Sequence, residues 1–335
     1  MKVNDVIQLL EELAPQRYAE DFDNTGLLVG DSTAEVTGIL VTLDTLEAVV
    51  DEAIEKECNL IVSFHPIIFS GLKKLTGSTY VERVVMKAIQ HNIAIFAIHT
   101  ALDNARNGVN DRICEQLGLK DRKILIPKKN TIKKLRTFVP KEATESVRNA
   151  LFEAGAGSIG NYSDCSFNTE GTGTYKGNEQ SDPVKGKKGE RHYEPEIQIG
   201  VTFPIHLQSA IIGALHKVHP YEEVAYEITT LENKNQHIGM GMIGSLEEEM
   251  SEKDFLHHTK SHMNTECIRH SSLTGKGIRK VAVLGGSGSF AIDAAKAAGA
   301  DAFISADFKY HDFFRAEGKI LLTDIGHYES EQYTK

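Results

Sequence analysis

The sequence repeats one pattern near its beginning and near its end, and this repeat constrains the fold more than any other feature. In both places, apolar runs typical of buried parallel strands alternate with stretches of helical periodicity. This is the order of βαβ units, which need parallel neighbours and right-handed crossovers. GILVTLD and NLIVSFHP match KVAVL and DAFISADF, and IAIFAIHTALD matches KILLTDIGHYESE. We therefore predict two related α/β halves that face one another.

The composition changes between these halves, which indicates an inserted domain. Two strand-like runs are each followed by a helical pattern, and one more strand closes the segment: 134–140, 143–154, 196–203, 207–218 and 224–228. This order predicts a small ferredoxin-like α+β domain. The polar stretch 176–194 has no apolar period, so we expect a mobile loop there. The predicted domains are a first lobe at 1–126, the insertion at 127–236 and a second lobe at 237–335.

Bulk composition excludes several classes of protein. The chain has 335 residues, of which 41% are hydrophobic and 25% charged, as expected of a globular protein with two or three structural units. Its net charge of −10 opposes binding to a phosphate backbone, so we expect no nucleic-acid partner. The four cysteines are scattered, which fits a reducing compartment and argues against a disulfide scaffold. The sequence shows neither a signal peptide nor a run of about 20 apolar residues, and we expect a cytoplasmic protein without a membrane partner.

Histidines and carboxylates gather at the ends of the predicted strands. His65 ends the second apolar run, where open α/β sheets collect their functional groups. His99 and Asp103, and likewise His327 and Glu331, are spaced four residues apart, so each pair shares one face of a helix. Imidazole together with carboxylate suits Zn²⁺, Mn²⁺ or Fe²⁺. The alternative for each pair is a helix cap or a surface contact, and the occurrence of both pairs at equivalent places favours a metal site.

Three further motifs are less specific. Asp307 and His311 flank aromatic residues and fit a helix cap, an orienting group or a proton shuttle. The glycine-rich stretch 285–289 fits a tight turn better than an anion-binding loop. The segment 216–223, which contains HPYEE, lies in the insertion and fits a turn at a domain or subunit contact.

Taken together, the motifs resemble one known family. FDNTGLLVG, GILVTLD, the HP at a strand end, HTALD, GGSG, DFKYHD and GHYESE resemble the NIF-three-like family, also catalogued as GTP cyclohydrolase 1 type 2 homologues. The insertion with its HPYEE resembles the CutA-like domain of longer bacterial members. The resemblance implies two α/β lobes around a central metal cleft. It also implies a toroidal homo-oligomer, a hexamer, with the metal sites facing an internal cavity. Family members continue beyond GHYxxE, so we expect the second lobe to be truncated at Lys335.

The resemblance also implies a ligand set, and this chain departs from it at one position. In the family, two adjacent histidines precede the proline at the strand end, and here Phe64 takes the first of these places. The metal ligands carried over are His65, Asp103, His327 and Glu331. One ion, most simply Zn²⁺ with Mn²⁺ or Fe²⁺ as alternatives, keeps His65, Asp103 and Glu331. The second ion keeps only His327 and a share of Glu331, so we expect one tight ion and one weakened site.

Two functions remain open at this level. The family name implies a metal-dependent hydrolase that acts on a nucleotide-like or other small substrate, with a metal-activated water as nucleophile and His99 or His311 as proton carrier. The other function is a non-catalytic metal-binding or regulatory scaffold whose inserted domain senses a small-molecule ligand. The loss of one ligand at Phe64 favours this second function.

Overall fold

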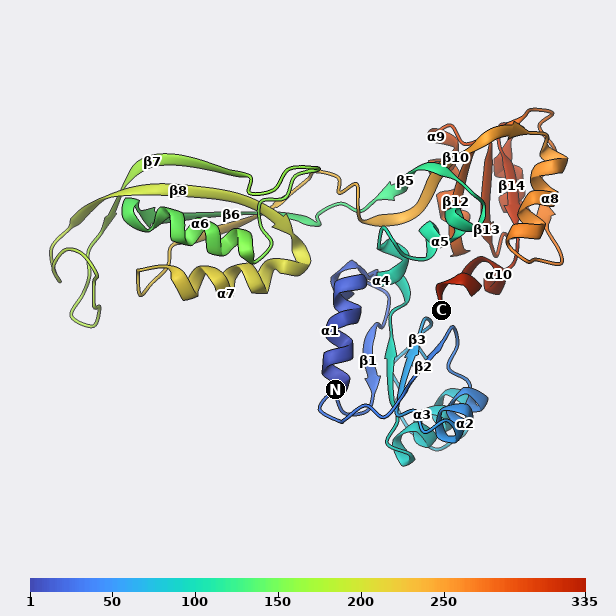
Figure 1. Cartoon of the computed structure of the whole chain (residues 1–335), viewed down its shortest axis with the longest axis horizontal. Helices are drawn as coiled ribbons and strands as arrows, with labels where there is room; N and C mark the ends of the chain where they lie inside the picture. Colours follow the sequence, from blue (N-terminus) through green and yellow to red (C-terminus); the bar gives the residue numbers. More distant parts are fainter. The chain divides into compact units, whose positions relative to one another are not determined.

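The computed structural model describes residues 1–335, and these form two compact units. The larger unit contains residues 1–128 and 236–335, and the smaller unit contains residues 129–235. The larger unit contains two sheets and the smaller unit one (Figure 1). Each unit has its own hydrophobic core. No helix in the chain combines the length and the apolar character that crossing a membrane requires.

The amino-terminal part of the larger unit is built on a four-stranded sheet of order β1-β4-β3-β2. Its elements are α1 (Val3–Leu13), β1 (Gly26–Val29), β2 (Ile39–Thr42), α2 (Glu47–Glu55), β3 (Leu60–Ser63), α3 (Tyr80–Gln90), β4 (Ala94–Ala97), α4 (His99–Asn104) and α5 (Val109–Gln116). Strands β2, β3 and β4 are parallel, and β1 runs antiparallel to β4. Ile61 and Ile95 pack against α2 and α3, whereas their neighbours Leu60 and Phe96 belong to the core that contains α1. Alternate residues of β3 and β4 therefore serve opposite faces of the sheet.

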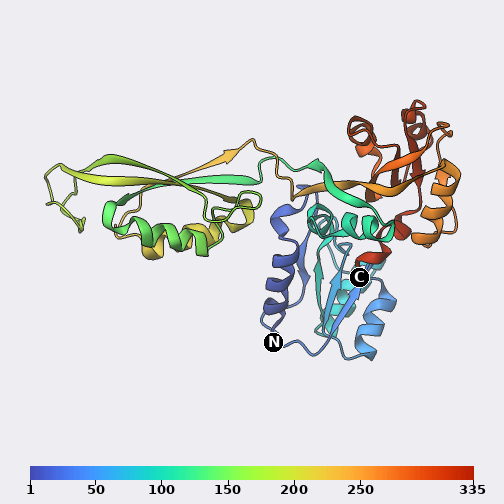
Figure 2. The ribbon, with the colours of Figure 1, turned by 45° about the horizontal axis from the view of Figure 1, so that its top comes forward.

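The carboxyl-terminal part of the larger unit is built on a six-stranded sheet of order β11-β14-β13-β12-β10-β5. Its elements are β5 (Lys120–Pro127), β10 (Gly239–Met250), α8 (Glu252–His262), β11 (Arg269–His270), β12 (Ile278–Ser287), α9 (Ile292–Ala297), β13 (Ala302–Ala306), β14 (Leu321–Asp324) and α10 (His327–Glu331). Strands β12, β13 and β14 are parallel, and β11 runs antiparallel to β14. The order β11-β14-β13-β12 thus repeats β1-β4-β3-β2. Figure 2 shows the larger unit from a second direction, with its amino-terminal part in blue and cyan and its carboxyl-terminal part mainly in orange and red. The internal sequence similarity corresponds to this shared topology.

Strands β5 and β10 differ from the sequence-based expectation. They pair antiparallel with each other, and β10 also pairs with β12, so residues 120–127 lie in the sheet of the second half. The sequence analysis placed these residues at the end of the first lobe and predicted neither strand. β5 begins with KDRK and β10 ends with EEEM. Pairing partners rather than local apolar pattern therefore decide their structure.

The smaller unit carries two helices on one face of an antiparallel sheet. Its elements are β6 (Ile132–Pro140), α6 (Thr144–Glu153), β7 (Ser166–Tyr175), β8 (His192–Pro204), α7 (Gln208–Val218) and β9 (Tyr226–Leu231), with the strand order β7-β8-β6-β9. This is the β-α-β-β-α-β order of the ferredoxin-like motif. Strand β7 was not predicted, because SFNTEGTGTY is polar, rich in glycine and largely exposed at the edge of the sheet.

Candidate metal centre

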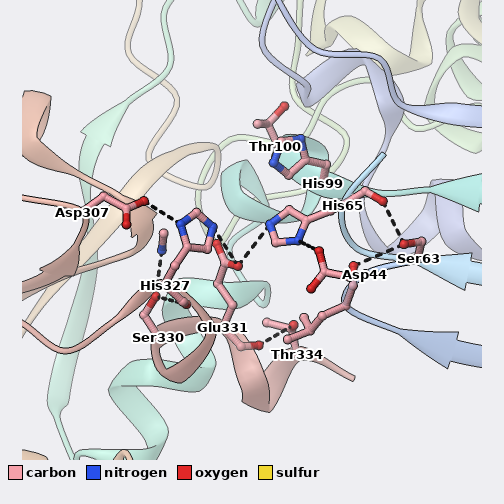
Figure 3. Close-up of polar contacts among 12 residues, drawn as sticks. Asp44, Ser63, His65, His99, Thr100, Asp307, His327, Ser330, Glu331 and Thr334 are labelled. Carbon is pink, nitrogen blue, oxygen red and sulfur yellow. Dashed lines mark hydrogen bonds and ion pairs between the residues drawn. The ribbon is translucent and has the colours of Figure 1, made fainter. Parts of the chain in front are cut away.

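His65 is fixed at the end of β3 by its neighbours. The Ser63 hydroxyl lies 3.2 Å from the carbonyl oxygen of Leu43 and 2.8 Å from that of His65, and it holds the chain where the strand stops. The His65 Nδ1 atom lies 3.0 Å from Oδ1 of Asp44, which follows the adjacent parallel strand β2. Figure 3 shows the other ring nitrogen, Nε2, turned toward Glu331. A carboxylate at Nδ1 orients an imidazole so that Nε2 is free for a ligand.

His327 and Glu331 extend from one face of α10 on the opposite side of the site. Glu331 is only 3% exposed, and its Oε2 atom lies 3.3 Å from Nε2 of His327. The His327 Nδ1 atom lies 2.7 Å from Oδ2 of Asp307, so this ring is oriented in the same way as His65. Gly286 has a φ of +67°, and a Cβ there would lie 2.5 Å from Oε1 of Glu331. The glycine-rich turn therefore makes room for the glutamate.

The two histidines converge on one oxygen atom. Glu331 Oε2 lies 3.2 Å from His65 Nε2 and 3.3 Å from His327 Nε2, and the ring centroids are 5.4 Å apart (Figure 3). One ligand atom from each of the three residues lies within 4.8 Å of the others, as binding of a single metal ion requires. Glu331 Oε2 is nevertheless buried, and neither nitrogen meets the geometry of a hydrogen bond to it. A buried carboxylate oxygen that faces two imidazole nitrogens fits a divalent cation between them.

The protonation of the cluster follows from this geometry. The contact with Glu331 raises the pKa of His327 to about 9 against the opposing effect of burial, with a further contribution from Asp307. Burial lowers the pKa of His65, but Glu331 and Asp44 outweigh burial and raise it above its usual value. Burial raises the pKa of Glu331, and its contacts with His327 and His65 outweigh burial, so the value is lowered. Protons on the two rings would compete with a metal ion for the same nitrogens.

Asp103 lies on α4 and lines a cavity of about 210 Å³ together with His327 and Glu331. Its Oδ1 atom is buried without a hydrogen-bond partner. Burial, followed by the charges of Glu331 and Asp23, holds the pKa of Asp103 well above its usual value. Asp103 is not among the three residues whose ligand atoms lie within 4.8 Å of one another. It is the next carboxylate available to an ion in this cavity.

His99 lines the same cavity but is turned toward another partner. Its Nδ1 atom lies 2.8 Å from Oδ1 of Asp23, which also accepts hydrogen bonds from the backbone N–H and the hydroxyl of Thr100. The ring centroid of His99 lies 5.3 Å from that of His65. Its φ of +27° is rare for a non-glycine residue, and such strain is common at functional sites.

The two remaining residues singled out in the sequence lie apart from the cluster. His311 is exposed and packs against the rings of Tyr310 and Phe314, at centroid distances of 5.1 and 5.6 Å, and it does not line the cavity. Phe64 is 4% exposed and packs in the core, with its ring 4.9 Å from that of His65 and 5.5 Å from that of His99. Phe64 therefore lies beside the histidine cluster and offers no ligand atom.

Asp23 and Asp44 were missed by sequence reasoning, although each orients a histidine of the site. A signal for Asp44 was present, because it ends the GILVTLD run beside the strand that carries His65, and parallel strand ends meet at one edge of a sheet. Asp23 carried no such signal, since it precedes β1 in an irregular segment and meets His99 only through the fold.

Comparison with known proteins places this geometry in a family. A Bacillus subtilis (strain 168) protein named GTP cyclohydrolase 1 type 2 homolog is 41% identical over 325 residues, which cover 96% of this chain and 87% of that protein. The crystal structure of a Bacillus cereus protein related to NIF3 matches with a TM-score of 0.86 and 38% identity, covering 100% of this chain and 90% of that chain. A Staphylococcus aureus protein structure matches with a TM-score of 0.76 and 32% identity over 98% and 88% of the two chains. These findings confirm the resemblance seen in the motifs. The family model of Duf34/NIF3 (NGG1p interacting factor 3) matches residues 1–335, and the chain therefore belongs to that family.

Proposed function

We propose that the protein binds a divalent metal ion between His65, His327 and Glu331, with Asp103 as a further carboxylate ligand from the cavity. The observation that carries this proposal is the buried Glu331 Oε2 atom, which faces two Nε2 atoms at 3.2 and 3.3 Å without a directed donor. Two imidazoles with a carboxylate form a usual donor set for Zn²⁺, and Mn²⁺ or Fe²⁺ are the alternatives.

The same site binds one ion tightly in this proposal and a second ion weakly or not at all. The ring of Phe64 stands where the family resemblance calls for an additional histidine. That ring is buried against His65 and His99 and supplies no ligand atom. The sequence-based assignment gave the tight ion to His65, Asp103 and Glu331, whereas the distances favour His65, His327 and Glu331.

The reaction class we propose is hydrolysis of a nucleotide-like substrate. The curated relatives are named GTP cyclohydrolase 1 type 2 homologues, and a cavity adjoins the cluster. Three exposed phenylalanines line that cavity, namely Phe22, Phe69 and Phe290. The rings of Phe22 and Phe69 have centroids 6.5 Å apart. Such rings provide flat apolar faces on which a purine or another planar ring can stack.

His99 is the proton carrier in this proposal, in preference to the exposed His311. If its Nδ1–H donates to Asp23, the neutral ring keeps Nε2 as an acceptor toward the cavity. A divalent ion held by His65, His327 and Glu331 would supply Lewis acidity for hydrolysis. His99, which lines the cavity, would accept a proton from the attacking water.

A non-catalytic scaffold is the second candidate function, and Phe64 is the observation that favours it. The test is to strip the protein of metal, reload it with Zn²⁺, Mn²⁺ or Fe²⁺ and follow hydrolysis of GTP and other nucleotides. Turnover that rises with metal occupancy and falls in His99→Gln supports the hydrolase. Stoichiometric metal without turnover on any nucleotide supports the scaffold.

Our proposal also covers the fold of the inserted segment and the oligomeric state. We infer that residues 127–236 form a CutA-like domain, which the strand order β7-β8-β6-β9 and the HPYEE segment support. The family resemblance supports a toroidal homohexamer in the cytoplasm. Light scattering coupled to gel filtration tests the oligomeric state. We expect six chains per particle, and a monomer would contradict the proposal.

A further inference from the structure

The smaller unit contains a cavity of about 690 Å³ on the face of its sheet that α6 and α7 do not cover. Ile197, Ile199 and Val201 of β8 pack toward the helices, whereas the alternating residues Glu196 and Gln198 line the cavity. A volume of this size matches the sites that bind small organic molecules. Neither the metal cluster nor the family name accounts for it.

Glycines in β7 hollow out the floor of this cavity. Gly171 pairs with Glu196 and Gly173 with Glu194, so each glycine faces a glutamate across the ladder. A Cβ at Gly173 would collide with Oε2 of Glu196. At the end of the strand, the Tyr175 hydroxyl donates to the carbonyl oxygen of Lys185 at 2.9 Å and ties the following loop to the sheet.

The two buried glutamates of β8 that face these glycines are compensated unequally. Glu194 and Glu196 are 6% and 8% exposed. Glu194 pairs with Lys185 Nζ at 2.5 Å and with His192 Nε2 at 2.9 Å. Glu196 receives one hydrogen bond, from the Tyr221 hydroxyl at 2.8 Å, and has no ion pair. A buried carboxylate without a cationic partner is costly, so the cavity presents an uncompensated negative charge.

The HPYEE segment builds one wall around this charge. His219 Nδ1 accepts the backbone N–H of Tyr221 at 3.1 Å, and its Nε2 donates to the carbonyl oxygen of Phe138 at 3.0 Å. Burial, followed by the hydrogen bond to Glu196, raises the pKa of Tyr221, so its hydroxyl remains a donor. His219 is therefore fully engaged in positioning the segment, while Glu222 and Glu223 line the cavity.

We propose that this cavity binds a small organic cation, in which an amine or guanidinium group is carried on an apolar chain. Four carboxylates line the cavity and only one lysine does: Glu170, Glu196, Glu222 and Glu223 with Lys176. Glu170 also pairs with Lys141 at 3.2 Å, which leaves three carboxylates without a lysine or arginine partner. The rings of Tyr175 and Tyr221 lie 6.0 Å apart and offer aromatic faces to a cation. The cation would pair with Glu196 on the floor while its chain packs along these rings.

The test is calorimetric titration of the full chain with agmatine and with spermidine. Both cations should bind, and their affinity should fall as the salt concentration rises. Glu196→Gln keeps the acceptor for Tyr221 but removes the charge, and it should weaken binding about tenfold or more. The exposed Glu223→Lys should also weaken binding without disturbing the fold. Glu232→Gln and Glu232→Lys make the same changes at an exposed residue outside the cavity, and they should leave the affinity unchanged.

Three results would overturn the proposal. The first is that neither cation binds to the folded protein. The second is that Glu196→Gln and Glu223→Lys bind the cations as tightly as the unmodified protein does. The third is that GTP binds instead, and that Glu223→Lys strengthens GTP binding. None of these results bears on the metal cluster, because all of the varied residues belong to the smaller unit.

Discussion

The two halves of the larger unit share a sheet topology, yet they use their equivalent helices differently. In the second half, α10 directs His327 and Glu331 toward His65. In the first half, α4 carries the matching pair His99 and Asp103, but His99 is held by Asp23. The repeated scaffold therefore places a histidine and a carboxylate at both strand ends. A carboxylate lies at Nδ1 of all three histidines, but only His65 and His327 bring Nε2 close to Glu331, and we therefore propose these two as the metal-binding histidines.

This difference has a chemical consequence. Glu331 lies between two imidazoles, whereas the carboxylate of Asp103 has a buried Oδ1 atom with no partner. Two imidazoles, those of His65 and His327, converge on Glu331, and the first half supplies only His65 to this cluster. This inequality of the two halves is the basis on which we propose one strong ion site rather than two.

The largest effect is expected for Glu331→Gln. Glu331 is the only residue in contact with both ligand histidines, and the amide cannot supply the negative charge that a divalent ion needs. We expect the metal affinity to fall by at least about 100-fold, because even indirect contacts of metal ligands are worth 10- to 100-fold. Zn²⁺ competition titration measures the change. Glu329→Gln on the same helix is the matched control and should bind normally; equal affinity in both variants would refute the role of Glu331.

An intermediate effect is expected when the orienting carboxylates are changed. Asp44→Asn and Asp307→Asn leave the ligands in place but remove the carboxylates at Nδ1 of His65 and of His327. Each should lower the metal affinity by about 10- to 100-fold. Asp51→Asn, in a surface pair with Lys87, serves as the control. If only Asp44→Asn weakened binding, His327 would not be a ligand and the two halves would differ more than we propose.

The smallest effect on metal affinity is expected for Asp23→Asn, which should instead lower the free energy of unfolding. Burial raises the pKa of Asp23, but hydrogen bonds from His99 and Thr100 outweigh it and lower the value from 3.8 to about 2. The resulting stabilisation is present above pH 3.8 and is lost as the pH falls toward 2. We expect the variant to lose about 2 kcal/mol of unfolding free energy at pH 7, with a smaller difference at pH 3.

Urea unfolding at both pH values measures this difference, with the exposed Asp21→Asn as the control. A constant difference between pH 7 and pH 3 would show that the Asp23 charge contributes nothing. A tenfold loss of metal affinity in Asp23→Asn would place His99 inside the metal cluster.

The parts of the fold that the sequence predicted are those whose residues carry the information locally. Strands β3 and β4 are fully buried, so LIV and AIFA are continuous apolar runs. Strands β5, β7 and β10 contain charged residues or glycines and exist because of their pairing partners, which no local pattern reveals. The same limit applies to the loop over the second cavity, where Tyr175 and Lys185 meet across ten positions.

The residues of the site likewise fall into those that the local sequence predicts and those that it does not. His65, His327 and Glu331 follow apolar runs, and strand-end position together with helical spacing predicts that they meet. Asp44, which orients His65, ends the neighbouring strand and could have been found in the same way, whereas Asp23, which contacts His99, lies in an irregular segment and emerged only from the fold. Sequence spacing could not reveal that His327, and not Asp103, has a ligand atom within 4.8 Å of those of His65 and Glu331.

The number of tightly bound ions per subunit tests the central claim most directly. Metal-free protein is titrated with Zn²⁺ by calorimetry, and its metal content is measured after gel filtration, for the unmodified chain, Phe64→His and Phe64→Leu. We predict one tight ion in the unmodified chain and in Phe64→Leu, and a second ion in Phe64→His, because only the added imidazole supplies a new ligand. Two equally tight ions in the unmodified chain, or an unchanged count in Phe64→His, would contradict the account.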